Sequence, residues 1–393
     1  MKSVKKGAAS SRTAALCAAA ALQLFALCVL RFPAHAGGPG SAGMQVLKTD
    51  MSPRAAGMGG AFVAVADDIY SLDYNPAGLG QLYMPEASAM YMAGFDDASL
   101  QHFSFGMPLP IRGLAGLSKP GAGISLLMSD AGKFNYQAIM PDGSVFSKSF
   151  TAQKDLALTF GYGEKVYSGE VNLEGYNAKI EQYLGVNAKY IRSTLLEDST
   201  PPSTLAFDAG WLLLEPKLGL SLGASIANYG GGLKYASETT KLPSIIRLGA
   251  AYQHSTITDQ SILLCAESDF YSSESLKSLR FGTEYQFEDI FKLRLGYKAA
   301  EDNKGFTLGF GLHYNDMSLD FATGLANEVY NSSQLAFSYK FTGITVKEYR
   351  KKTAYKDPQP EGKPAARPAQ AKPARKTPAA PAKKKDSDFF WIY

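Results

Sequence analysis

Apolar and polar residues alternate along most of the chain, in segments about ten residues long that turn residues separate. In residues 306–314, Phe, Leu and Tyr occupy the even positions, and Thr, Gly and His occupy the odd positions. Residues 291–297 repeat the pattern, with Lys and Arg on the polar face. A two-residue period gives a strand one apolar and one polar face, and segments of this length are typical of a transmembrane β-barrel.

The alternation predicts an all-β fold of about fourteen antiparallel strands. We expect them near residues 85–94, 99–108, 120–139, 144–163, 179–193, 203–214, 217–228, 242–253, 260–270, 276–287, 290–299, 304–315, 317–325 and 332–342. Tight turns are predicted at Glu215-Pro216, Glu288-Asp289 and Asn315-Asp316, and longer connections at 194–202, 229–241 and 326–331. Bacterial barrels have short periplasmic turns and an even number of strands. The chain is therefore expected to enter the first barrel strand and to leave the last one on the periplasmic side.

The third and fourth strands are long enough to extend beyond the bilayer as a hairpin, closed at residues 141–144 by a Pro-Asp-Gly-Ser turn. The third strand begins with an unusual sequence that contains Pro120, Gly121 and Gly123. Proline removes a ladder donor and glycine weakens a strand, which favours a lateral opening in the wall here. The alternative is that Pro120 only ends a periplasmic turn.

A segment rich in small residues precedes the first strand, from Arg54 to Gly80. It contains six alanines and the glycines Gly57, Gly59, Gly60, Gly78 and Gly80. Glycine allows backbones to approach closely, while Asp67-Asp68 and Asn75-Pro76 divide the segment into short elements. The pattern predicts a compact plug inside the lumen of the barrel, within residues 37–84.

Strand parity places charges of both signs on the inward face of the barrel. The inward set is Lys189, Asp208, Arg247, Glu267, Asp269, Arg280, Glu284, Lys292, Arg294, His313 and Asp320, together with Gly210, Gly219, Gly223, Gly249, Gly282, Gly296, Gly309 and Gly311. Arg247, Arg280 or Arg294 could bind the carboxylate of a ligand in bidentate fashion. The alternative is that these arginines pair with Glu284, or with Asp67 and Asp68 of the plug.

The two ends of the chain differ in composition from its body. Residues 1–36 have the basic start, apolar run and Ala-His-Ala ending of a secretory signal peptide cleaved near Ala36. A lipoprotein signal ending at Cys28 is the alternative, although the bulky Leu27 argues against it. After cleavage at Ala36 only Cys265 remains, so no intramolecular disulfide is expected. The barrel is expected to span residues 85–342.

Residues 343–393 form the last predicted part, a disordered tail rich in Lys, Pro and Ala. Five basic and no acidic residues precede Gly37, and thirteen basic and five acidic residues follow from Lys347; since the whole chain carries +4, the body carries −9. An acidic body argues against binding to nucleic acid. The tail could bind an anionic periplasmic or cell-wall partner, with its terminal FFWIY as an apolar anchor, or could be a solvated extension.

The signal peptide, the plug and the strand count together resemble the FadL family of outer-membrane transport proteins, including its PorV-like and spirochaete-type members. The resemblance covers residues 44–342 and is most specific at residues 52–62, 66–68 and 75–79, read as SPRAAGMGGAF, ADD and NPAGL. It implies that an amphipathic ligand adsorbs at the outer loops, enters the lumen and leaves sideways through a gap in the wall after the plug shifts. Asn75, Pro76 and Ala77 match the tripeptide of the family's plug; alternatively they only turn the chain.

The resemblance implies a channel for long-chain fatty acids or similar hydrophobic compounds in the outer membrane, in contact with outer-membrane lipid. A PorV-like scaffold or secretion-associated barrel is the alternative. We expect no enzyme activity, cofactor or metal. The histidines His102, His254 and His313 are isolated in sequence, and no HExxH, paired-cysteine or GxSxG motif is present.

Overall fold

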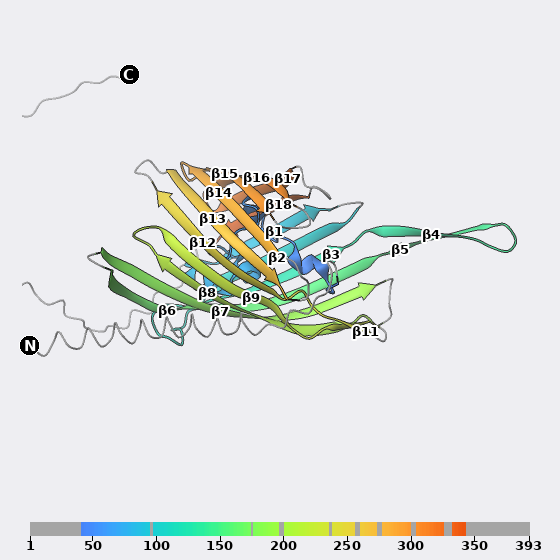
Figure 1. The fold of residues 1–393 in the computed structure, drawn as a ribbon, viewed down its shortest axis with the longest axis horizontal. Helices are drawn as coiled ribbons and strands as arrows, with labels where there is room; N and C mark the ends of the chain where they lie inside the picture. Colours follow the sequence, from blue (N-terminus) through green and yellow to red (C-terminus); the bar gives the residue numbers. More distant parts are fainter. Residues whose placement is uncertain are drawn as a thin grey trace, which may run out of the picture. The chain divides into compact units, whose positions relative to one another are not determined.

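A closed antiparallel β-barrel dominates the computed structural model, shown in Figure 1. The structure describes residues 41–94, 97–173, 176–195, 200–235, 238–255, 260–272, 277–299, 304–325 and 332–342. The predicted signal peptide, the basic tail and the 326–331 connection lie outside these residues. In the part that is described, fourteen strands form the barrel, and β1 closes it by pairing with β18, Glu86 opposite Lys340.

Each barrel strand pairs with both of its neighbours in the wall. The barrel strands are β1 (Glu86–Ala93), β2 (Ser99–Pro108), β3 (Gly121–Asp130), β6 (Gln153–Leu173), β7 (Tyr176–Leu195), β8 (Ser203–Glu215), β9 (Leu220–Gly230), β12 (Ile245–Ser255), β13 (Gln260–Tyr271), β14 (Lys277–Phe287), β15 (Phe291–Ala299), β16 (Gly305–Tyr314), β17 (Met317–Leu325) and β18 (Ser333–Lys340). The expected fold class and strand number are confirmed.

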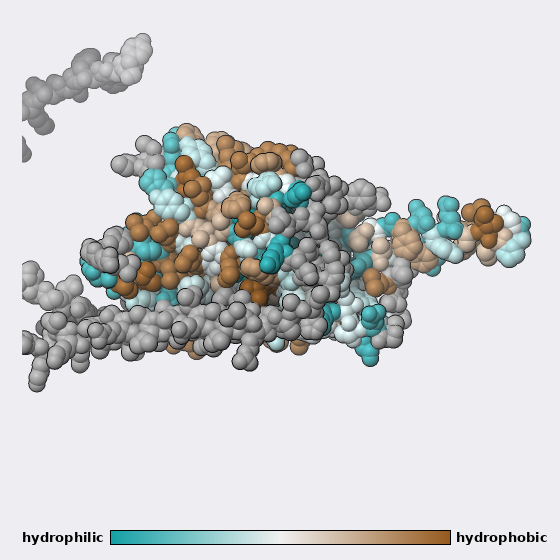
Figure 2. All heavy atoms as spheres, in the orientation of Figure 1, coloured by the Kyte–Doolittle hydropathy of each residue, from teal (hydrophilic) through white to brown (hydrophobic). Residues whose placement is uncertain are grey.

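The two faces of the wall differ as the alternation predicts. On β16, the side chains of Phe306, Leu308 and Phe310 are exposed on the outside, and apolar side chains are spread over the visible outer face of the barrel in Figure 2. The charged side chains of Glu284 and Arg294 are buried on the inside. An apolar exterior and a polar interior suit a barrel surrounded by lipid. No helix among the described residues is long and apolar enough to cross a membrane.

Three details of the strands differ from the sequence prediction. The expected third and fourth strands are each interrupted, and their outer parts form a separate hairpin of β4 (Lys133–Ile139) and β5 (Val145–Thr151). The break follows Asp130, whose carboxylate accepts a hydrogen bond from the backbone N–H of Gly132, a residue with a φ of 85°. β6 and β7 extend past the expected ends at residues 163 and 179. Gly219 lies in the turn before β9, with a φ of 73°, rather than on the inward face.

The barrel has one end with tight turns and one end with longer segments. The tight-turn end includes Glu215-Pro216, Glu288-Asp289 and Asn315-Asp316, as predicted, together with the β2–β3 connection at residues 109–120. The opposite end, called the loop end below, carries the β4–β5 hairpin and a smaller hairpin of β10 (Leu233–Tyr235) and β11 (Glu238–Thr240). The general rule for bacterial barrels predicts that the tight-turn end is the periplasmic one.

Residues 41–85 run inside the barrel as a plug of short elements. These are η1 (Gln45–Lys48), α2 (Pro53–Gly57), α3 (Ser71–Tyr74) and η2 (Pro76–Gln81). The hydroxyl of Ser52 caps α2 by accepting from the N–H of Ala55, and the side-chain oxygen of Asn75 caps η2 by accepting from the N–H of Ala77. The side chains of Phe62, Ile69, Leu72 and Leu79 are fully buried, and they belong to an apolar core that the plug shares with inward-facing wall residues such as Leu100 and Leu127.

Candidate functional site

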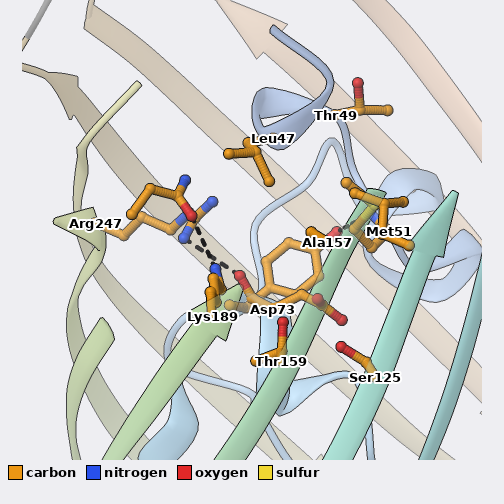
Figure 3. A pocket seen from close by; sticks show the side chains of 12 residues that line it. Leu47, Thr49, Met51, Asp73, Ser125, Ala157, Thr159, Lys189 and Arg247 are labelled. Atoms are coloured by element: carbon orange, nitrogen blue, oxygen red, sulfur yellow. Dashed lines mark hydrogen bonds between the residues drawn. The ribbon is translucent and has the colours of Figure 1, made fainter. Parts of the chain in front are cut away.

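A small cavity lies between the plug and the half of the wall nearest the loop end (Figure 3). The cavity has a volume of about 20 Å³, which is room for one or two water molecules. The cavity is lined by plug residues Leu47, Thr49, Met51, Asp73 and Tyr74, and by wall residues Ser125, Leu127, Ala157, Thr159, Lys189, Asn228 and Arg247. Strands β3, β6, β7, β9 and β12 therefore supply one side of the cavity, and the plug supplies the other.

Two cations of the wall, Lys189 and Arg247, reach this cavity, and the wall holds them differently. The Lys189 ammonium lies 2.8 Å from a carboxylate oxygen of Asp208 and donates to the Asn228 side chain over 2.8 Å. The Arg247 guanidinium lies 3.8 Å from Glu267 and 3.9 Å from Asp269, and its Nε has no hydrogen-bond partner among the described residues. Its Nη1 donates a long hydrogen bond of 3.4 Å to the Asp73 carbonyl, and the guanidinium lies 5.7 Å from the centre of the Tyr74 ring. Arg247 is therefore the more loosely held cation and the better candidate for an incoming anionic group.

The plug side of the cavity contains an acid–histidine pair that the sequence did not reveal. Asp73, on α3, lies 3.1 Å from Nε2 of the buried His102 on β2. The imidazole stacks on Tyr70 with ring centroids 5.7 Å apart, and the Tyr70 hydroxyl lies 2.6 Å from that of Ser88. The residues are far apart in sequence, so only the fold brings them together. They link α3 to the wall beside the cavity.

Glycines on the inward face of the wall let the backbone of the plug lie directly against the strands. A methyl group added at Gly185 would lie 2.2 Å from the carbonyl carbon of Pro76, and one at Gly223 would lie 2.1 Å from the carbonyl oxygen of Val63. On the other side of the barrel, a methyl at Gly296 would lie 2.0 Å from the amide nitrogen of Gly59. These distances leave no room for a side chain. The plug is thus seated closely on opposite sides of the lumen.

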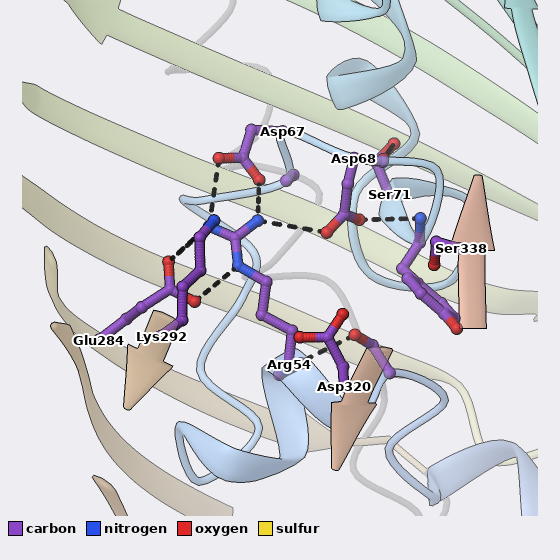
Figure 4. A network of polar contacts seen from close by, with 12 residues as sticks. Arg54, Asp67, Asp68, Ser71, Glu284, Lys292, Asp320 and Ser338 are labelled. Atoms are coloured by element: carbon purple, nitrogen blue, oxygen red, sulfur yellow. Dashed lines mark hydrogen bonds and ion pairs between the residues drawn. The ribbon is translucent and has the colours of Figure 1, made fainter. Parts of the chain in front are cut away.

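A cluster of ion pairs joins the plug to the opposite side of the wall (Figure 4). The guanidinium of Arg54 donates two hydrogen bonds of 3.0 Å to Glu284 on β14 and also pairs with Asp67 and Asp68. The expectation that these two plug acids face the wall arginines is wrong. Their partner is Arg54, which belongs to the same segment of the plug. The residue that the wall contributes to this cluster is an acid, Glu284.

The other two wall arginines are engaged with buried acids. Arg294 donates to Glu284 and Asp320 over 2.6 Å each, and Arg280 donates to Asp50 over 3.2 Å. Arg294 therefore follows the predicted alternative of pairing with Glu284. These contacts make Arg280 and Arg294 structural partners of acids, and their ligand-binding role remains a prediction.

Asp50 gives the plug a second charged connection to the wall. Its carboxylate accepts from Lys298 over 2.6 Å and from Arg280 over 3.2 Å. Burial by itself raises the pKa of this carboxyl, but the two cations outweigh burial and lower the pKa from 3.8 to about 2. Asp50 is therefore held as an anion between two wall strands.

The Asn-Pro-Ala tripeptide lies where the plug meets β8. The Asn75 amide donates to the carbonyl of Val63 over 2.8 Å and to that of Trp211 over 3.0 Å. It thus connects two parts of the plug with the wall, and Pro76 and Ala77 begin η2 immediately after it. These contacts give the tripeptide a structural role, and its gating role remains a prediction.

The predicted lateral opening lies in a wall segment that is fully paired. β3 pairs with β2 and with β6 over residues 121–130, so its ladder includes Gly121 and Gly123. Both glycines face the plug: a methyl group added at Gly121 would lie 1.9 Å from the carbonyl oxygen of Leu79. Pro120 accepts a hydrogen bond from Leu109 at the foot of the strand. Opening here requires loss of ladder bonds, and the opening stays a prediction.

The fold, rather than the sequence, links the chain to known proteins. No family model matches the chain, and no curated protein matches it in sequence. A deletion mutant of the TodX monoaromatic hydrocarbon channel superimposes with a TM-score of 0.50 at 12% identity, covering 75% of this chain and 100% of that one. The Ralstonia pickettii toluene transporter TbuX gives 0.47 at 13% identity, covering 74% and 98%. The chain therefore has the fold that its FadL resemblance implies, a closed antiparallel barrel of fourteen strands, and shares that fold with the TodX channel.

Proposed function

We propose that this protein is an outer-membrane channel for hydrophobic compounds, and that long-chain fatty acids or similar amphiphiles pass through its plugged barrel. The observation that carries the proposal is the cavity between plug and wall, which lies toward the loop end and has Arg247 on its lining. The shared fold with TodX, which is described as a monoaromatic hydrocarbon channel, supports the general class of ligand.

The lining of the cavity favours an amphiphile over a plain hydrocarbon. Arg247, the loosely held cation, would meet a carboxylate, while Leu47, Met51 and Leu127 offer apolar surface beside it. A dry cavity that binds benzene is about 150 Å³, far larger than the space present here. Ligand entry therefore requires the plug to move away from the wall.

The contacts between plug and wall favour movement of the plug on the side that faces the cavity. There the contacts include the Asp73–His102 pair and the hydrogen bond from the Asn187 amide to the Leu72 carbonyl. On the opposite side, Arg54 and Asp50 are held by several buried ion pairs. We infer that α3 shifts during transport while α2 stays attached to the wall.

Uptake of a labelled long-chain fatty acid by cells that lack their own transporter would test the proposal. An Ala157→Phe variant fills the cavity from β6, and its uptake should fall severalfold. Leu158→Phe, on the outer face of the same strand, is the matched control and should transport as the original protein does. Uptake by the Leu158→Phe variant that is no higher than in cells without the protein would contradict the proposed channel. Equal, high uptake by both variants would contradict the role of the cavity.

A PorV-like scaffold is the second candidate, and the close seating of the plug on wall glycines favours it. A scaffold needs a closed lumen and a partner, whereas a channel needs a plug that moves. Purification from native membranes distinguishes the two functions: a stoichiometric partner that is lost on deletion of residues 347–393, without any fatty-acid uptake, would support the scaffold. Uptake without a partner would support the channel.

A further inference from the structure

The connection between β2 and β3, residues 109–120, folds into an ordered loop at the tight-turn end. The N–H of Leu109 donates to the Pro120 carbonyl over 2.8 Å, and the N–H of Gly113 donates to the Ser118 carbonyl over 3.2 Å. The Arg112 side chain closes the tip by donating from Nε to the Gly116 carbonyl over 2.9 Å. Internal bonds of this kind hold the loop in one shape, so its exposed side chains have a defined direction. We call residues 109–120 the wall loop.

The wall loop lies against the outer face of the barrel. On β6, Ala157 and Thr159 face the cavity, and so parity places Phe160, Tyr162 and Glu164 on the outside. The Glu164 carboxylate accepts from the backbone N–H of Ala115 over 3.3 Å and from the Tyr162 hydroxyl over 3.2 Å. Although it points outward, Glu164 is only 7% exposed. The loop therefore covers a carboxylate that would otherwise be exposed on the outer face of β6.

The free side of the wall loop is apolar. Ile111, Leu114 and Leu117 are 56%, 92% and 52% exposed. The outer faces of the two strands that the loop joins carry the exposed side chains of Phe105 and Ile124. The apolar surface of the barrel wall therefore continues into the loop.

The charge of the wall loop is positive. Residues 109–120 contain Arg112 and Lys119 and no acidic residue. Arginine and lysine near the end of a membrane-spanning segment extend toward the headgroups while their stems remain in apolar surroundings. An anionic lipid surface attracts such side chains. Charge and apolar surface thus point to the same occupant.

We propose that the wall loop is a membrane anchor, which inserts Ile111, Leu114 and Leu117 into the phospholipid leaflet at the tight-turn end. Water is a poor partner for three exposed aliphatic side chains on an ordered loop. A lipid leaflet covers them without a further protein and accommodates Arg112 at its surface. The anchor does not depend on the proposed transport, and a scaffold barrel would have it too.

A nitroxide attached at position 114 would test the anchor in the mature chain, folded in vesicles of phosphatidylglycerol and phosphatidylethanolamine. Leu114→Cys gives the labelling site, and the buried Cys265 of the original chain provides the blank. Lys217→Cys, in the β8–β9 turn at the same end, is the control. We expect the ratio of collisions with oxygen to collisions with a water-soluble nickel chelate to be severalfold higher at position 114.

Equal ratios at positions 114 and 217 would overturn the proposal, because both sites would then lie in water. A label at Leu117→Cys provides an independent measurement on the same loop, since its side chain is also exposed. If the loop inserts into the leaflet, the ratio of oxygen to nickel-chelate collisions at position 117 will be close to that at position 114 and higher than that at position 217. If the loop instead binds a soluble protein, both labels will be exposed to the nickel reagent in vesicles that contain only the barrel.

Discussion

Replacing Arg54 by methionine should loosen the plug from the wall. Methionine fills a similar volume without charge or hydrogen bonds, so the change removes the contacts to Glu284, Asp67 and Asp68. Glu284 and Asp68 are nearly buried, and a buried carboxylate without its cation is costly. The variant should therefore be less stable, and the defect should be located in the plug.

The expected loss follows from the partners that remain. Breaking a buried pair by removing one member typically costs about 3–5 kcal/mol. Glu284 keeps the 2.6 Å hydrogen bond from Arg294, and Asp67 is partly exposed, so we place the loss near the lower limit, about 3 kcal/mol. Adding Glu284→Gln removes the uncompensated charge. The double variant should therefore lose less unfolding free energy than the two single variants lose together, by about 1–3 kcal/mol.

Reversible denaturant unfolding of the barrel in lipid vesicles, followed by tryptophan fluorescence, would measure these free energies. Limited proteolysis at the plug would show whether it has become accessible. Arg192→Met, on the exposed face of β7, is the control and should stay within about 0.5 kcal/mol of the original protein. If Arg54→Met is equally neutral, the ion pairs do not hold the plug, and the reasoning is refuted.

Three further predictions concern the seat of the plug, its acid response and the wall loop. Gly185→Ala places a methyl against the Pro76 backbone and should cost about 1–3 kcal/mol of unfolding free energy in the same measurement; no change would mean that the plug moves aside freely. Asp50 has a lowered pKa, so its contribution of about 2 kcal/mol is complete above pH 4 and is lost as the pH falls toward 2. The unfolding free energy of Asp50→Asn should lack this dependence on pH. If the unfolding free energies of the variant and the original protein change identically between pH 4 and pH 2, ionised Asp50 does not stabilise the plug. Glu164→Ala removes the acceptor for the wall loop, so a nitroxide at position 114 should become more accessible to the nickel reagent; unchanged accessibility would show that Glu164 does not hold the loop.

Local alternation predicted much of the wall, because every lipid-facing residue must be apolar wherever a strand crosses the bilayer. The outward side chains of β16 and the turn at Asn315-Asp316 followed directly from this pattern. The extended parts of β6 and β7 did not, since strands outside the bilayer need not alternate. Alternation predicts only a connection at residues 109–120, because the contact of this loop with Glu164 joins residues 49 positions apart in the chain.

The candidate site was predicted less completely than the wall. Parity placed Arg247 on the inward face, where it lines the cavity. The partner of Asp73 was not predicted, because His102 is separated from it by the whole of β1 and has no motif around it. The partner of Asp67 and Asp68 was predicted incorrectly, since charge alone cannot rank one nearby arginine over another.

The sequence by itself determined that the chain makes an antiparallel barrel with a plug of small residues, because strand period, turn residues and glycine content are local properties. The tertiary structure decided which side chains meet inside the barrel, and therefore which cations hold the plug and which one remains loosely held beside the cavity. It also decided that the β2–β3 connection folds onto the outer wall. Contacts between distant strands depend on barrel closure and strand register, and no local pattern in the chain contains that information.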